Sequence, residues 1–108
     1  MRMDQRPLVA RSPAAAKLLP RFIAHRADDV ANIRLALDRG DYALIARLGH
    51  NMRGNGRSYG FPDIATIGER LEAAALARDT GCVREQVAAL EDWVARSAQA
   101  EGSNGGGR

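Results

Sequence analysis

The stretch from Gly49 to Phe61, GHNMRGNGRSYGF, decides how the chain is interpreted. Its four glycines are typical of a loop, yet apolar residues at helical spacing run through it. They are Ile45, Leu48, Met52 and Tyr59. Each glycine inside a helix costs about 1 kcal/mol relative to alanine, so Gly49, Gly54 and Gly56 need another explanation. We predict that the stretch is the second half of a helix that begins at Tyr42.

Three further segments combine helical periodicity with signals for the start of a helix. The first covers residues 13–39, with Ser12 before it as a cap and a break at Pro20 that separates a short helix from the main one. The second begins at Pro62, and the third begins with Thr80 as its expected cap. Their apolar stripes predict the core: Leu19, Ile23, Val30, Ile33, Leu37, Ile64, Ile67, Leu71, Ala74, Ala75, Val83, Val87, Leu90 and Val94.

These segments predict an all-α fold, an antiparallel up-down four-helix bundle with a short extra N-terminal helix. Gly40 suits a left-handed helix end, and Asp41 suits the cap of the helix that follows. The bundle is expected to occupy residues 13–100, after a flexible segment 1–12. Residues 101–108 are rich in glycine and have no apolar residue, which predicts a disordered tail.

The composition excludes several classes of protein. No apolar run approaches the roughly 20 residues that cross a bilayer, and no apolar block suits a secretory signal. Cys82 is the only cysteine, so no internal disulfide or cysteine-based zinc site is expected, and a cytoplasmic location fits. The net charge is +3, but the basic residues are spread among acids, which indicates a solvated surface rather than a nucleic-acid footprint.

One face of the helix from Tyr42 has chemistry of its own. His50 lies two residues from both Leu48 and Met52, so it points away from the buried stripe. The same outward face carries Arg53, Gly54 and Arg57, and Arg47 lies one turn before His50. An exposed histidine can act as a nucleophile, a glycine one turn along leaves room for a second protein, and an arginine offsets the charge of a phosphoryl group. By contrast, Gly49, Gly56 and Gly68 are expected to allow close helix packing.

These residues resemble the signature of the histidine-containing phosphotransfer (HPt) domain. The signature has a histidine, a basic residue three later, glycines four and ten later, and an apolar helix ending in Leu-Glu. Here the matching residues are His50, Arg53, Gly54, Gly60 and Leu71-Glu72. The resemblance covers roughly residues 18–95. The family more often has lysine at the position of Arg53, and arginine is bulkier although it keeps the charge.

The resemblance implies a phosphorelay intermediate that accepts and donates a phosphoryl group on His50. Its partner would be an aspartyl-phosphate receiver domain, a hybrid histidine kinase, or both. Arg53 would support the phosphate charge, and Arg47, Gly54 and Arg57 would contact the partner. Such a domain has no ATP site, is no enzyme on its own and holds no cofactor or metal, because the Mg²⁺ lies on the receiver. We expect a monomer.

Two other functions stay open at this point. The chain could dock a receiver or another signalling protein without phosphotransfer. It could also be a pure interaction or oligomerisation bundle, although that function would need apolar residues on a second face, and the His50 face has none. The sequence does not name the kinase, the receiver or the direction of phosphate flow.

Overall fold

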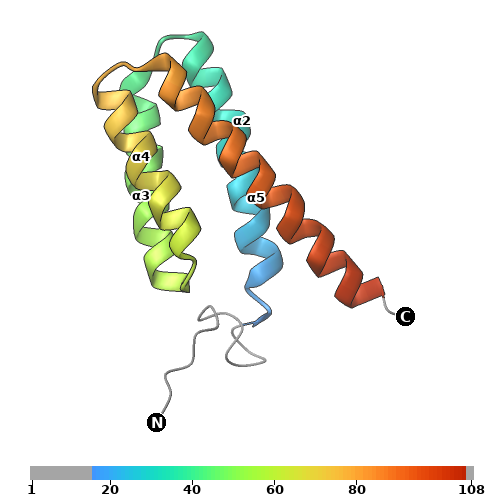
Figure 1. Ribbon diagram of the computed structural model, residues 1–108. Helices are drawn as coiled ribbons and strands as arrows, with labels where there is room; N and C mark the ends of the chain where they lie inside the picture. The colour runs from blue at the N-terminus through green and yellow to red at the C-terminus, as the bar shows by residue number, and fades with distance from the viewer. Residues whose placement is uncertain (1–15, 107–108) are drawn as a thin grey trace.

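The computed structural model describes residues 16–106, with side chains described as far as residue 100. This part of the chain has four helices and no strand: α2 (Leu19–Asp38), α3 (Tyr42–Tyr59), α4 (Pro62–Leu76) and α5 (Thr80–Gly106). Figure 1 shows that the chain ascends in α2, descends in α3, ascends in α4 and descends in α5. None of these helices is long and apolar enough to cross a membrane.

The stretch that is rich in glycine is helical, as predicted. Helix α3 continues through Gly49, Gly54 and Gly56 and ends at Tyr59, after which Gly60 adopts a left-handed conformation with φ of 79°. At its start, the Asp41 side chain accepts a hydrogen bond from the backbone N–H of Leu44 at 3.1 Å. The predicted cap at Asp41 is therefore confirmed.

Two predicted helix starts need comment. The cap before α5 is Asp79 rather than Thr80, because the Asp79 carboxylate accepts from the backbone N–H of Cys82 at 3.0 Å. The Thr80 hydroxyl instead lies 2.6 Å from the hydroxyl of Tyr42, which ties the start of α5 to the start of α3. The predicted break at Pro20 lies just before it, because residues 17 and 18 form a turn and α2 begins at Leu19. Pro20 is thus in the first turn of α2, where a proline displaces no helical hydrogen bond.

The two ends of the chain differ in how far they can be compared with the prediction. Residues 1–12 and the start of the expected short helix at Pro13 lie outside the described residues. At the other end, α5 continues to Gly106, so residue 100 is not the end of the helix. Adding a residue to a formed helix needs no new nucleation, which explains how α5 extends into a stretch of poor helix formers.

The core lies between the four helices and follows the predicted stripes. Of the residues predicted for it, Leu19, Leu37, Leu48, Tyr59 and Val94 are half-buried, and all the others are buried. The largest fully buried side chains come from every helix: Ile33, Ile45, Met52, Ile64, Leu71, Leu90 and Val83. The apolar periodicity of the sequence therefore identifies the inside of the bundle.

Helices α3 and α4 approach each other so closely that their backbones touch. A Cβ atom at Gly56 would lie 2.4 Å from the backbone nitrogen of Ala65, and one at Gly68 would lie 2.4 Å from that of Arg53. At Gly49 it would lie 2.7 Å from the backbone nitrogen of Glu72. Real Cβ atoms do not come this close, so the predicted packing role of the three glycines is confirmed.

Four aromatic rings close the end of the bundle at which α3 turns into α4. Phe22 stacks on Phe61 with ring centroids 4.9 Å apart, and Tyr59 and Trp93 pack around this pair. The Arg26 guanidinium lies 4.7 Å from the centre of the Phe22 ring, and the residue as a whole is only 6% exposed. Arg26 falls on the predicted apolar stripe of α2, three residues after Ile23 and four before Val30, but it was not among the residues predicted for the core.

Arg26 pairs with a carboxylate that is also partly buried. Its Nε atom donates to Oδ2 of Asp29 at 2.8 Å, and the Asp29 side chain is 15% exposed. Burial raises the pKa of the Asp29 carboxyl above its ordinary value of 3.8, and the positive charge of Arg26 opposes this rise only in part.

The first prediction compares two glycines of the same helix. Gly56→Ala should lower the free energy of unfolding by about 1–3 kcal/mol, because the new methyl group clashes with the backbone of α4. Gly54→Ala should keep or raise it, since a Cβ at Gly54 meets nothing within 4 Å and alanine is the better helix former. Thermal unfolding followed by circular dichroism measures both. Equal melting temperatures for the two variants would contradict the close backbone contact.

The second prediction concerns the pH dependence of stability. Because the folded pKa of Asp29 lies above its unfolded value, the stability that this carboxyl contributes is fully present below the unfolded pKa and falls as pH rises through the folded pKa. Arg26→Met removes the cation that opposes the rise, so the folded pKa should increase further. Each further unit of pKa increase enlarges the loss of folding stability at high pH by about 1.4 kcal/mol.

Urea unfolding at pH 4, 5.5 and 7 tests this second prediction. The free energy of unfolding of Arg26→Met should fall more steeply between pH 4 and pH 7 than that of the wild type. Arg34→Met is the matched control, because Arg34 pairs with Glu91 on the surface, where both side chains are more than half exposed. Parallel pH profiles for Arg26→Met and the wild type would show that the buried pair does not control Asp29.

Candidate functional site

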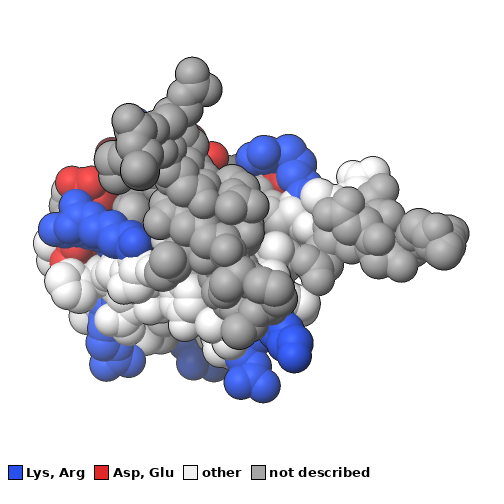
Figure 2. All heavy atoms as spheres, turned by 90° about the horizontal axis from the view of Figure 1, so that it is seen from below, with Lys and Arg blue, Asp and Glu red and all other residues white. Residues whose placement is uncertain are grey.

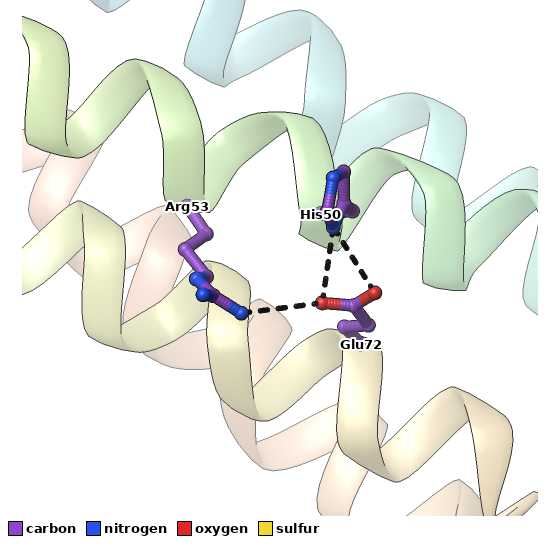
Figure 3. A network of polar contacts seen from close by, with 3 residues as sticks. All are labelled: His50, Arg53 and Glu72. Atoms are coloured by element: carbon purple, nitrogen blue, oxygen red, sulfur yellow. Dashed lines mark hydrogen bonds and ion pairs between the residues drawn. The ribbon is translucent and has the colours of Figure 1, made fainter.

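His50 stands in the middle of α3 with its side chain 66% exposed, as the helical spacing predicts. Its ring is not free, because Nδ1 lies 3.2 Å from Oε2 and 3.4 Å from Oε1 of Glu72 on α4 (Figure 3). A carboxylate can only accept hydrogen bonds. The contact therefore favours the form of the imidazole with its hydrogen on Nδ1, which leaves the lone pair on Nε2.

The approach of α3 to α4 explains why these two side chains meet. Gly49 immediately precedes His50, and the place where its Cβ would stand is 2.7 Å from the backbone nitrogen of Glu72. With a side chain at Gly49, the helices would have to move apart and the carboxylate would move away from the ring. The small residue beside the histidine therefore sets the geometry of the site.

Arg53 shares the same carboxylate. Its Nη1 atom lies 4.0 Å from Oε1 of Glu72, and its side chain is 36% exposed. Figure 3 shows His50 and Arg53 extending from α3 toward Glu72, with the carboxylate between them. Glu72, which is 26% exposed, is thus flanked by an imidazole and a guanidinium group.

The other predicted site residues lie on the exposed side of α3. Gly54, one turn after His50, is exposed, and nothing lies within 4 Å of where its Cβ would be. Arg47 and Arg57 are also exposed. The structure therefore places an accessible histidine beside open surface, with an arginine about one turn before it and another two turns after it. Their functional roles stay predictions.

Glu72 is the residue that sequence reasoning missed as a partner of His50. From the sequence, Glu72 is identified only as part of the Leu71-Glu72 pair at the end of an apolar helix. The signal lay in the glycines: if α3 and α4 run antiparallel and meet at Gly49 and Gly68, then Glu72, one turn beyond Gly68, lies near His50.

The charges at the end of the bundle that is seen from below are dispersed. On the face drawn in Figure 2, the Lys and Arg side chains stand at separate places on the periphery, in part beside Asp and Glu. Arg96 with Asp92 and Arg34 with Glu91 are surface pairs of this kind. The arginines of the His50 face are set apart from these by their position beside the histidine.

Comparison with known protein families agrees with this geometry. The family model described as "Hpt domain" matches residues 17–100, which is most of the chain. No curated protein and no solved structure gives a significant match. Since the family match spans all four helices as far as residue 100 and includes His50, the chain belongs to the Hpt domain family and is a four-helix bundle of two-component phosphorelay signalling.

Proposed function

We propose that this protein is a phosphorelay intermediate that accepts a phosphoryl group on Nε2 of His50 and donates it again. The observation that carries the proposal is the exposed imidazole whose other nitrogen contacts Glu72. The donor and acceptor are aspartyl groups of receiver domains, which include those of hybrid histidine kinases. The Hpt family exchanges phosphate with such partners, and the role fits an accessible nucleophile beside the open surface at Gly54.

The transfer step balances without a further reactant. The Nε2 lone pair attacks phosphorus in line, a P–N bond forms, and the P–O bond to the aspartyl carboxylate breaks with its electron pair on oxygen. The ring gains positive charge while its Nδ1 hydrogen stays in place. The Glu72 carboxylate, 3.2 Å from Nδ1, stabilises this charge. The reverse attack by a carboxylate returns the group, so the same residues serve both directions.

Arg53 and the partner together stabilise the negative charge of the phosphoryl group. The guanidinium of Arg53, one turn after His50, is close enough to exchange Glu72 for the phosphoryl oxygens once they arrive. Arg47, Gly54 and Arg57 form the docking surface beside the histidine. The protein needs no cofactor, because the Mg²⁺ that neutralises the phosphoryl group in transit is held by the receiver.

On this proposal, the protein is a phosphoryl carrier that has no kinase activity of its own and acts as a monomer in the cytoplasm. The alternative, a module that docks a receiver without transfer, would not need the imidazole to be accessible and fixed by a carboxylate. Binding alone would survive the loss of His50, whereas phosphotransfer would not.

The third prediction tests the phosphoacceptor. His50→Gln should take up no phosphate from a phosphorylated receiver, while its circular dichroism spectrum stays that of the wild type. The wild-type label should be labile in acid and stable in base, as expected for a phosphoramidate. Profiling the purified domain against the receiver domains of its source organism, with radiolabelled phosphate, gives the measurement. Label that persists in His50→Gln would rule out His50 as the sole acceptor.

The fourth prediction concerns Glu72 as a positioning residue. Glu72→Ala should slow transfer by roughly five- to thirtyfold, because the ring loses a contact worth about 1–2 kcal/mol. Glu72→Gln should recover part of the rate, since its amide oxygen can still accept from Nδ1 but carries no charge. Glu85 is an exposed glutamate of α5, so Glu85→Ala serves as the control and should transfer phosphate at the wild-type rate.

Two measurements on the same variants separate positioning from docking. The affinity of Glu72→Ala for the receiver should stay close to that of the wild type, while its single-turnover transfer rate falls. A parallel loss of affinity and rate, or equal rates for the alanine and glutamine variants, would argue against the positioning role.

A further inference from the structure

A hollow of about 370 Å³ opens on the outer side of the α3–α4 pair, at the end where the two helices are joined. Most of its lining residues are apolar or lack a side chain, namely Gly56, Gly60, Phe61, Pro62 and Ala65, and Thr66 adds a hydroxyl group. Arg57 of α3 stands on one rim and Glu69 of α4 on the other. None of the roles described above uses this surface, apart from Arg57.

The hollow is preformed. It exists because Gly56, Gly60 and Ala65 have little or no side chain. The backbones of Gly56 and Ala65 are in contact, so neither helix can move in to fill the space. Phe61 is fixed from behind by its stacking on Phe22 and by the edge of Trp93, at centroid distances of 4.9 and 5.5 Å. A rigid apolar hollow needs little rearrangement to bind a side chain.

We propose that this hollow receives an apolar side chain of the receiver domain that exchanges phosphate with His50. The inference rests on the proposed function and adds the place where the partner is anchored. Arg57 follows His50 by seven residues, which is about 10 Å along α3. A specific interface covers about 800 Å² on each partner, a patch that reaches about 16 Å from its centre. A receiver centred on His50 therefore covers the hollow.

The orientation of the histidine decides which side of α3 the receiver covers. A second hollow, of about 180 Å³, lies between α2 and α3 and is lined in part by Leu35, Leu44 and Leu48. His50, however, contacts Glu72 of α4, so its ring is held on the α3–α4 side. A partner that reaches Nε2 is thereby brought over the hollow beside Arg57.

The rims define the chemistry of the expected partner. Arg57 complements a carboxylate, and Glu69 complements a lysine or arginine. The anchoring segment of the receiver should therefore present one large apolar side chain between an acidic and a basic residue. A buried apolar side chain in such a pocket, shielded by charged rims, is the usual source of affinity in a protein interface.

A set of three variants tests this docking site. Side chains on a helix lean toward its N-terminus, so the indole in Glu69→Trp extends toward Ala65 and fills the hollow. Glu69→Gln controls for the lost charge, and Asn32→Trp places the same side chain in the α2–α3 hollow. The affinity of each variant is measured by calorimetry with the receiver that transfers phosphate to the wild type. Labelling of His50 by phosphoramidate, a small donor that needs no docking, is measured alongside.

Glu69→Trp should bind the receiver at least about tenfold more weakly than the wild type. Glu69→Gln should stay within about threefold, Asn32→Trp should match the wild type, and all three should be labelled normally by phosphoramidate. Wild-type affinity for Glu69→Trp, or an equal loss for Asn32→Trp, would overturn the docking site while leaving phosphotransfer intact. A wild type that accepts phosphate from phosphoramidate but from no receiver would overturn both the docking site and the relay function.

Discussion

The contact between the backbones of α3 and α4 is the constraint on which the site depends. Gly49, Gly56 and Gly68 leave no atom between the two helices, so the pair can neither separate nor slide without losing the contact. Each glycine disfavours the helix by about 1 kcal/mol, and the close packing of the two helices offsets this. The fixed register places Glu72 beside His50 and thereby turns a surface histidine into an oriented one.

The glycines of α3 and its end serve three physical purposes within a short stretch. Gly49 and Gly56 face α4 and permit the backbone contact, and Gly54 faces outward with open space around it. Gly60 ends the helix in a left-handed conformation, which returns the chain into α4. A stretch this rich in glycine could also have formed a loop. A loop, however, would not have held the imidazole against a carboxylate on a neighbouring helix.

Sequence reasoning reached the bundle and the exposed histidine because both depend on periodicity within one helix. It missed Glu72 because that contact depends on how two helices are aligned along their axes. It also missed the burial of Arg26, which falls on the apolar stripe of α2 between Ile23 and Val30, because arginine is seldom buried. His50 and Glu72 are 22 residues apart, and no pattern of apolar residues fixes their distance. Thr80 and Asp79 are both residue types that suit the cap of α5, so the sequence alone does not distinguish them. In the structure Asp79 caps the helix, and the hydroxyl of Thr80 contacts that of Tyr42.

Glu72 gives the site a balance that suits a reversible carrier. In the structure described here, the carboxylate lies between the imidazole and Arg53 and partly neutralises a face that is otherwise cationic. On the proposed function, an arriving phosphoryl group competes with Glu72 for Arg53, while the ring gains a positive charge that Glu72 stabilises. The same carboxylate thus favours the charged ring and disfavours the phosphoryl oxygens near it. On the proposed function, opposing effects of this kind would keep the phosphorylated imidazole from becoming too stable, so that the group could be passed on to the next carboxylate.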